Sequence, residues 1–216
     1  MIRPLTKRDV DILEERGLWK ASSSLHAVIR RLIRGKRPIE IGHIKSAHRV
    51  IFETANQHGI AGKYRQDNPE LKRLDGSLLE MAHWRDIPNK MAELGAELRD
   101  ATKNLKPPKT EEEYAEVVDL AIRFSHRLAC IHPFENGNGR ASRLLLNAIL
   151  LRAELPAVAI KEEKPQYLRA MQQADHGDFA LLWKMIVKGI IGSKELQYDI
   201  IRRKRAELAK RRGRGK

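Results

Sequence analysis

The sequence predicts a fold built mainly of α-helices, with one short β-hairpin. Over most of the 216-residue chain, apolar side chains recur at spacings of three and four residues, which is the period of an amphipathic helix. The exception is residues 70–84, where an Asp75-Gly76 pair between two short apolar runs predicts a tight hairpin turn. A lone hairpin has no sheet to join, so we expect it to pack on helices or to act as a flap.

One helix is expected at residues 111–130, and a more buried helix is expected to follow it. Thr110 and Glu113 fit a capping box, in which each side chain accepts a hydrogen bond from a free backbone N–H. The stretch SRLLLNAILLRAEL (142–155) is apolar on nearly all sides, which predicts a helix at 140–152 in the centre of the fold. Further helices are expected at 44–58, 86–104, 164–175 and 178–191.

The composition favours acidic partners. The chain has 42 Lys and Arg against 28 Asp and Glu, a formal net charge of +14, which suits nucleic acid, nucleotide phosphates or an acidic protein face. Part of this excess lies in residues 202–216, which either bind nucleic acid or form a solvated tail. A single cysteine, Cys130, fits a reducing compartment. No apolar run reaches the roughly 18 residues that span a bilayer, so we expect a cytoplasmic protein without membrane contact.

Residues 131–143, IHPFENGNGRASR, place a histidine, a glycine-rich loop and two arginines between the two central helices. Gly137 and Gly139 permit positive φ, so backbone N–H groups can converge at a helix N-terminus, where an anion is favoured. Arg140 and Arg143, expected in the first turn, oppose the helix dipole. An anion with several oxygens, such as a di- or triphosphate, would resolve that conflict. His132 is then a candidate general base for an attacking hydroxyl.

Two common phosphate-binding loops do not fit this stretch. The pattern G-x-x-x-x-G-K-[ST] is absent, and the two glycines follow a helix instead of the strand of a dinucleotide-binding fold. A simpler alternative is a glycine-rich helix connection with solvated arginines and with Phe134 as an apolar anchor. It explains each residue singly but not the whole set, which therefore indicates a phosphate site.

HPFENGNGRASR resembles the motif H-P-F-x-[DE]-G-N-G-R-x-x-R of the Fic/Doc family at every position but one. HRLACIHPF (126–134) is similar to the helix end before that motif, and GIAGKYR (59–65) is similar to the stretch before the family's flap. The resemblance covers roughly residues 40–190. It implies an all-α fold, a Fic-type helical bundle with a small β-hairpin flap over the active site.

The resemblance also implies an activity, because most active members transfer AMP from ATP to a Ser, Thr or Tyr hydroxyl of a target protein. His132 would deprotonate that hydroxyl, and the hairpin near 73–84 would clamp the target by strand addition. The positions matched to nucleotide and phosphate binding are Phe134, Gly137, Asn138, Gly139, Arg140 and Arg143. The implied division is an N-terminal helical segment (1–39), a Fic-like catalytic core (40–191) and a basic C-terminal helix or tail (192–216).

Asn136 is the one departure from the motif. The family's acidic residue at this place holds Mg²⁺, which prefers carboxylate oxygens, so Asn136 would hold the ion weakly. The variant resembles the subgroup labelled mobile mystery protein B.

The family's inhibitory motif [ST]-x-x-x-E-[GN] is not matched in KASSSLHAVIRR (20–31), where His26 and Ala27 replace the expected Glu and Gly. This favours an ordinary N-terminal helix and leaves inhibition by a separate antitoxin open.

Three alternatives to AMP transfer stay open. They are a Doc-like phosphate transfer with the nucleotide bound in reverse, a catalytically weak nucleotide-binding module, and a DNA-associated regulator that uses the basic tail. A toxin–antitoxin partnership and a homodimer are compatible with the AMP-transfer hypothesis.

Two reactive side chains precede the motif. His126 lies six residues before His132, which is not a one-face helical spacing, and we expect no Cys or carboxylate to complete a metal set with it. His126 is therefore interpreted as a core or helix-surface residue, and Cys130 as a buried spectator. The tryptophans, including Trp19, are interpreted as core or interface residues.

Overall fold

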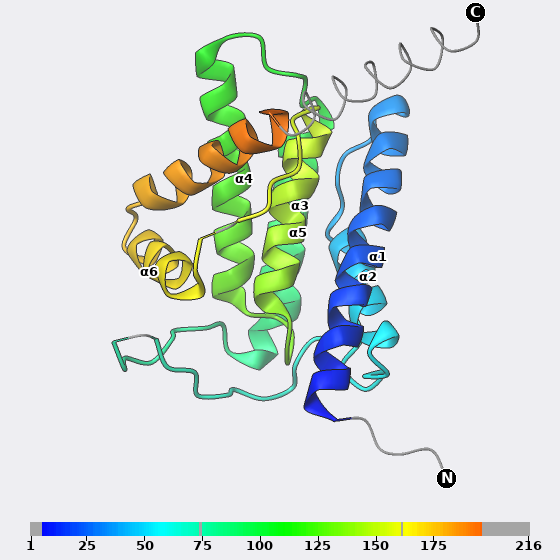
Figure 1. Cartoon of the computed structure of the whole chain (residues 1–216), viewed down its shortest axis with the longest axis vertical. Coiled ribbons are helices and arrows are strands. Elements are labelled where there is room, and N and C mark those ends of the chain that lie inside the picture. The colour runs from blue at the N-terminus through cyan, green and yellow to red at the C-terminus, as the bar shows by residue number, and fades with distance from the viewer. Residues whose placement is uncertain (1–5, 74, 161, 196–216) are drawn as a thin grey trace, which may run out of the picture.

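The computed structural model describes residues 6–73, 75–160 and 162–195, and it is mainly helical (Figure 1). The basic residues 202–216 lie outside the described residues. Among the described residues a further helix covers 180–195. The labelled elements are α1 (Lys7–Arg34), α2 (Ile41–Thr54), the 3-10 helix η1 (Trp84–Asp86), α3 (Ile87–Lys103), α4 (Glu111–Ile131), α5 (Asn138–Arg152) and α6 (Lys164–Asp175).

The helices predicted from periodicity are confirmed, with shifted ends. The helix expected at 111–130 is α4, and its capping box forms as predicted between Thr110 and Glu113. The helix expected at 44–58 forms earlier, as α2, and the one expected at 178–191 forms as 180–195. Within the described residues, every helix is too short or too polar to cross a bilayer.

Helix α5 lies in the centre, as its apolar sequence predicts. It contacts α1, α2 and α4 (Figure 1), and Leu145, Ala148 and Ile149 are fully buried. Burial of each large aliphatic side chain stabilises the fold by about 1.5–3 kcal/mol. Because α5 is enclosed in this way, the loop that precedes it is attached to a rigid element.

Helix α1 lies against α2 at very short range. A Cβ on the buried Gly17 would lie 2.4 Å from the carbonyl oxygen of Ile51, so only glycine allows this approach. The approach brings the first half of α1 to the first turn of α5, where Glu14 pairs with Arg140. Trp19, two residues further on, is 73% exposed, so it is not a core residue, and its alternative interpretation as an interface residue stays a prediction.

The predicted hairpin is not confirmed as a pair of strands among the described residues of 70–84. Lys72 and Leu78 form one isolated antiparallel bridge, and Leu79 N–H donates to the Leu71 carbonyl at 2.7 Å. Gly76 has φ 84°, so the chain does turn where the Asp-Gly pair predicts. A short ladder is marginal alone. The segment extends beneath α6 in Figure 1.

Candidate active site

His132 ends α4 in the left-handed conformation, with φ 52° and ψ 57°. Its Nδ1 lies 3.3 Å from the Ala129 carbonyl oxygen, which can only accept, so Nδ1 carries the proton of the neutral ring and Nε2 keeps its lone pair. Burial lowers the pKa of His132 below 6.5; the bond to Ala129 opposes this, and the nearby Arg65 cation adds to it. At pH 7 the ring is therefore a neutral base.

Asn138 and Arg65 hold the loop around this base. The buried Asn138 side chain accepts a hydrogen bond from Phe134 N–H at 2.9 Å and donates one to the Phe134 carbonyl at 2.7 Å. Arg65 donates from Nε to the His132 carbonyl at 2.7 Å and from its backbone N–H to the Pro133 carbonyl at 2.9 Å. Because its side chain is used inside the loop, Asn138 would contact an anion through its backbone N–H.

His48 of α2 holds the loop by a hydrogen bond and by ring stacking, and sequence reasoning missed it. Its Nδ1 accepts from Gly62 N–H at 3.0 Å, so the neutral ring donates from Nε2 to the Asn136 carbonyl at 2.9 Å. The ring stacks on Phe134 at 3.8 Å between centroids. Phe134 is 1% exposed and is therefore the predicted apolar anchor. Burial is the main cause that lowers the pKa of His48 to about 4.

The two motif glycines differ in conformation. Gly137 is the N-cap of α5 with φ 79°, as predicted, and a Cβ there would lie 2.6 Å from a carbon of the Phe52 ring. Gly139 lies inside α5 and is not among the glycines with positive φ, so that prediction is wrong. Because α5 begins at Asn138, Arg140 lies in its first turn, but Arg143 lies in the second turn, contrary to expectation.

Arg140 is already paired within the chain. Its guanidinium forms an ion pair with the Glu14 carboxylate of α1, and it lies 4.9 Å from the Phe52 ring centroid. The Arg140 and Glu14 side chains are only 18% and 13% exposed, and Gln57 also donates to Glu14, at 2.9 Å. The conflict between a cation and the α5 dipole is thus resolved here by a carboxylate of the protein itself.

Asn136 and Arg143 complete the motif. Asn136 is exposed, and its Oδ1 accepts from Gly137 N–H at 2.7 Å. A neutral amide oxygen that is already hydrogen-bonded fits Mg²⁺ less well than a carboxylate does.

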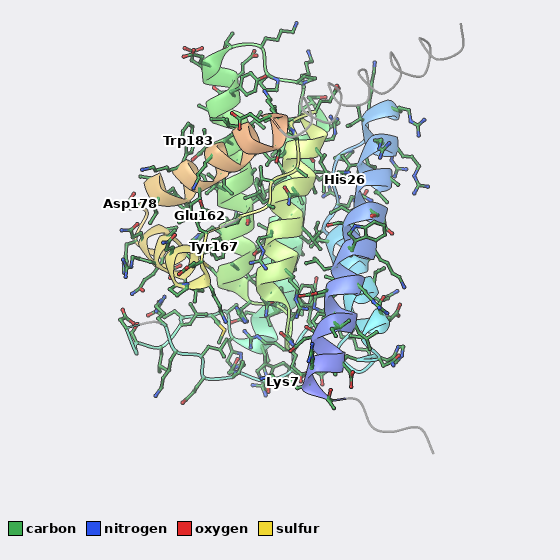
Figure 2. All side chains as sticks on the ribbon, viewed as in Figure 1. Lys7, His26, Glu162, Tyr167, Asp178 and Trp183 are labelled. Atoms are coloured by element: carbon green, nitrogen blue, oxygen red, sulfur yellow. The ribbon has the colours of Figure 1, made fainter. Side chains whose placement is uncertain are left out.

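The Arg143 guanidinium lies 5.7 Å from the ring centroid of Tyr167, which Figure 2 labels on α6. Burial raises the pKa of Tyr167, so its hydroxyl is neutral beside this cation.

A cavity of about 280 Å³ lies between the end of α4, the start of α5, the turn at residues 72–79 and α6. His132, Asn138 and Gly139 line it, and Tyr167 lines its α6 side. Arg140 and Arg143 are not among its lining residues. The structure therefore brings the candidate base and the N-terminus of α5 to one cavity, with the two arginines outside its wall.

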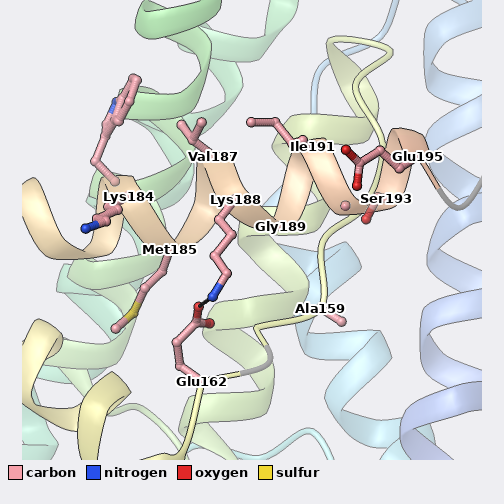
Figure 3. A pocket seen from close by; sticks show the side chains of 12 residues that line it. Ala159, Glu162, Lys184, Met185, Val187, Lys188, Gly189, Ile191, Ser193 and Glu195 are labelled. Atoms are coloured by element: carbon pink, nitrogen blue, oxygen red, sulfur yellow. Dashed lines mark hydrogen bonds and ion pairs between the residues drawn. The ribbon is translucent and has the colours of Figure 1, made fainter.

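A larger cavity of about 660 Å³ lies along helix 180–195 (Figure 3). Its lining includes Met185, Val187 and an ion pair at 3.2 Å between Lys188 and Glu162. None of its lining residues belongs to 131–143. The smaller cavity is therefore the candidate active site.

The fold and site define a helical protein that places a neutral histidine beside the N-terminus of a buried helix. Residues 38–150 match the model of the Fic/DOC family, and the chain belongs to this family. It is 30% identical over 169 residues to the protein adenylyltransferase Fic of Nematostella vectensis, which covers 77% of this chain and 36% of that protein. The chain thus spans about a third of the length of this relative.

Solved structures share the fold. A Fic domain-containing signalling protein from Bacteroides thetaiotaomicron has a TM-score of 0.64 at 25% identity, covering 84% of this chain and 70% of that one. Fic-1 of C. elegans has a TM-score of 0.67 at 21% identity, covering 95% and 56%. The BepC protein of Bartonella tribocorum, solved with bound AMPPNP, has a TM-score of 0.52 at 18% identity, covering 80% and 85%.

Proposed function

We propose that the chain transfers AMP from ATP to a hydroxyl side chain of a protein target, with His132 as the general base. The observation that carries this proposal is the hydrogen bond between Nδ1 of His132 and the Ala129 carbonyl. It makes Nε2 a proton acceptor in a cavity that the N-terminal turn of α5 also lines. The adenylyltransferase relatives and the related fold with bound AMPPNP support the proposal.

In the proposed reaction, Nε2 of His132 takes the proton of the target hydroxyl, and the hydroxyl oxygen attacks the α-phosphorus of ATP. The bond between the α-phosphorus and the bridging oxygen breaks, and pyrophosphate leaves. The backbone N–H groups of Asn138 and Gly139, with the α5 dipole, stabilise the negative charge that develops on the phosphate oxygens.

Arg140 and Arg143 would hold the leaving phosphates. Arg140 is paired with Glu14, so ATP must displace that carboxylate before this cation can bind phosphate. The neutral amide of Asn136, which already accepts a hydrogen bond, supports the proposal that this residue holds Mg²⁺ weakly. Neutralisation of the phosphate charge would therefore fall mainly to the two arginines, and any ion at Asn136 would be weakly held.

The segment 73–84 would receive the target protein. Its described residues form a single antiparallel bridge, between Lys72 and Leu78, and little other backbone pairing. Free backbone groups therefore remain, and an extended target segment can add to them as a strand. In this proposal residues 40–191 form the catalytic core, and the α1 segment within 1–39 contributes Glu14 to the phosphate site.

The test is incubation of the protein with cell lysate and ATP labelled at the α-phosphate, in parallel with ATP labelled at the γ-phosphate. We expect α-label on a protein target, and no label with His132→Ala. Transfer of γ-label alone would replace this proposal with a Doc-like phosphate transfer. Tight ATP binding with neither label transferred would replace it with a nucleotide-binding module.

A further inference from the structure

A second group of reactive side chains lies beside the candidate active site. His126 and Cys130 are four residues apart on α4, and Asp175 ends α6. Nε2 of His126 lies 2.9 Å from Oδ1 of Asp175, and Sγ of Cys130 lies 3.5 Å from that nitrogen and 3.6 Å from that oxygen. The expectation that no Cys or carboxylate would complete a metal set with His126 is therefore wrong.

The three separations are close to those of a tetrahedral zinc site. Zinc binds nitrogen and oxygen at about 2.0–2.1 Å and sulfur at about 2.3 Å, so tetrahedral ligand atoms lie about 3.4 Å apart for N and O and about 3.5 Å from sulfur. Both sulfur distances agree with those of tetrahedral ligands, but Sγ of Cys130 also lies 3.7 Å from Nδ1 of His126. It therefore lies beside the ring, and the Cys130 side chain or the imidazole must rotate before Sγ and Nε2 can bind one ion. The separation between His126 and Asp175 would widen by about 0.5 Å, from a hydrogen bond to a pair of ligands.

The surroundings suit a bound ion. The second carboxylate oxygen of Asp175 accepts from Arg73, at 2.9 Å from one terminal nitrogen and 3.3 Å from Nε, and such outer partners orient metal-binding carboxylates. The His126 ring packs edge-on against Phe179, which fixes its plane. The His126 and Asp175 side chains are only 9% and 16% exposed, so water competes little for the ligands.

We propose that His126, Cys130 and Asp175 bind one Zn²⁺ ion. A thiolate, an imidazole and a carboxylate form a ligand set that suits zinc better than magnesium. Cys130 and Asp175 line the same cavity as His132, so the fourth position of the ion opens to that cavity, where water or a cavity ligand completes the tetrahedron. The thiol releases its proton when the ion binds. This site does not depend on whether the chain transfers AMP.

Cobalt is the probe that tests the site, because Co²⁺ takes the same ligands and reports them by absorption. A thiolate bound to Co²⁺ gives a charge-transfer band in the near ultraviolet that nitrogen and oxygen ligands do not give. Cys130 is the only cysteine in the chain, so the band reports this site alone. We expect the band to saturate at one equivalent of Co²⁺ and to disappear when Zn²⁺ replaces the cobalt.

Four variants complete the experiment. Cys130→Ser should lose the band, and Asp175→Asn and His126→Gln should each weaken Co²⁺ binding by at least about tenfold. His176→Gln, which changes the exposed neighbour of Asp175, is the matched control and should bind as the parent does. Circular dichroism checks that each variant is folded. Absence of the band in the folded parent protein, or unchanged affinity in Asp175→Asn, overturns the proposal.

Discussion

Arg140 at the N-terminus of α5 forms an ion pair with Glu14, which lies 126 residues earlier on α1. A cation in the first turn of a helix opposes the helix dipole, and the Glu14 carboxylate compensates it inside the protein. If Arg140 binds phosphate as proposed, Glu14 and ATP would compete for one guanidinium. Helix α1 is thereby part of the candidate site.

Glu14→Gln should increase the affinity for ATP. It removes the carboxylate that must be displaced, and a charged hydrogen bond contributes about 1.5–3 kcal/mol, so we expect a gain of about tenfold or more. The ligand-free protein should lose about 1–2 kcal/mol of unfolding free energy, because Arg140 loses its partner. Calorimetric titration with ATP measures the first effect and urea denaturation the second. Glu15→Gln, at an exposed neighbour, is the control, and equal ATP affinity in both variants would contradict the competition.

His132→Ala should lower the rate of transfer by about 10²–10⁴, the usual contribution of a general base, while ATP affinity stays nearly the same. The parent protein has a further signature in its pH profile. The pKa of His132 lies below 6.5, so the base is neutral above that pH, and the rate should stay level down to about pH 6.5 and fall only in more acidic solution. If the rate instead falls to half its maximum already above pH 7, a group other than His132 is the general base.

Asn136→Asp should strengthen Mg²⁺ binding at the motif. A carboxylate adds charge where the amide has none, and it can still accept from Gly137 N–H as Asn136 does. We expect half-maximal activity at a lower Mg²⁺ concentration and a higher rate when the metal is limiting. The measurement is a Mg²⁺ titration of label transfer in both proteins. Weaker ATP binding with no gain in activity would falsify the proposed transfer and favour a binding module.

His48 should make the protein less stable in acid. Its pKa is about 4 in the folded protein and about 6.5 when unfolded, so the unfolded chain binds more protons between these values and stability falls as the pH drops through that range. Between pH 7.5 and 5 this linkage costs about 2 kcal/mol. Urea denaturation at both pH values should show the loss, and His48→Gln should reduce it. An equal loss in the variant would assign the acid effect to other groups.

Gly137→Ala and Gly139→Ala form a matched pair. The first substitution combines a positive φ with a Cβ 2.6 Å from the buried Phe52 ring, whereas a Cβ at Gly139 would approach only the flexible end of Arg143, at 3.4 Å. We expect Gly137→Ala to destabilise the protein by at least about 2 kcal/mol and Gly139→Ala to change stability by less than about 1 kcal/mol. Thermal unfolding compares them. Equal stability of the two variants would refute the close approach at Gly137.

The local features of this protein could be predicted from its sequence. Helix periodicity, the Thr110–Glu113 capping box and the turn at Gly76 depend on residues a few positions apart, so the printed chain contains the whole interaction. The motif placed His132 at a helix end, and the apolar run of α5 predicted a central helix. The helix boundaries differ from expectation: α5 begins two residues before its expected start, so Arg143 lies in the second turn and Gly139 lies in the helix instead of the loop.

The partners of these residues were decided only by tertiary packing. Glu14 reaches Arg140 because Gly17 lets α1 lie close to α2. His48 holds the loop from α2, but the sequence of α2 predicts only an amphipathic helix and does not indicate which residues its buried face contacts. Asp175 meets His126 across 49 residues. Periodicity and motif spacing describe one element at a time, whereas an ion pair or a ligand set between helices depends on how closely and at what angle those helices pack. That packing depends on the side chains of every helix together.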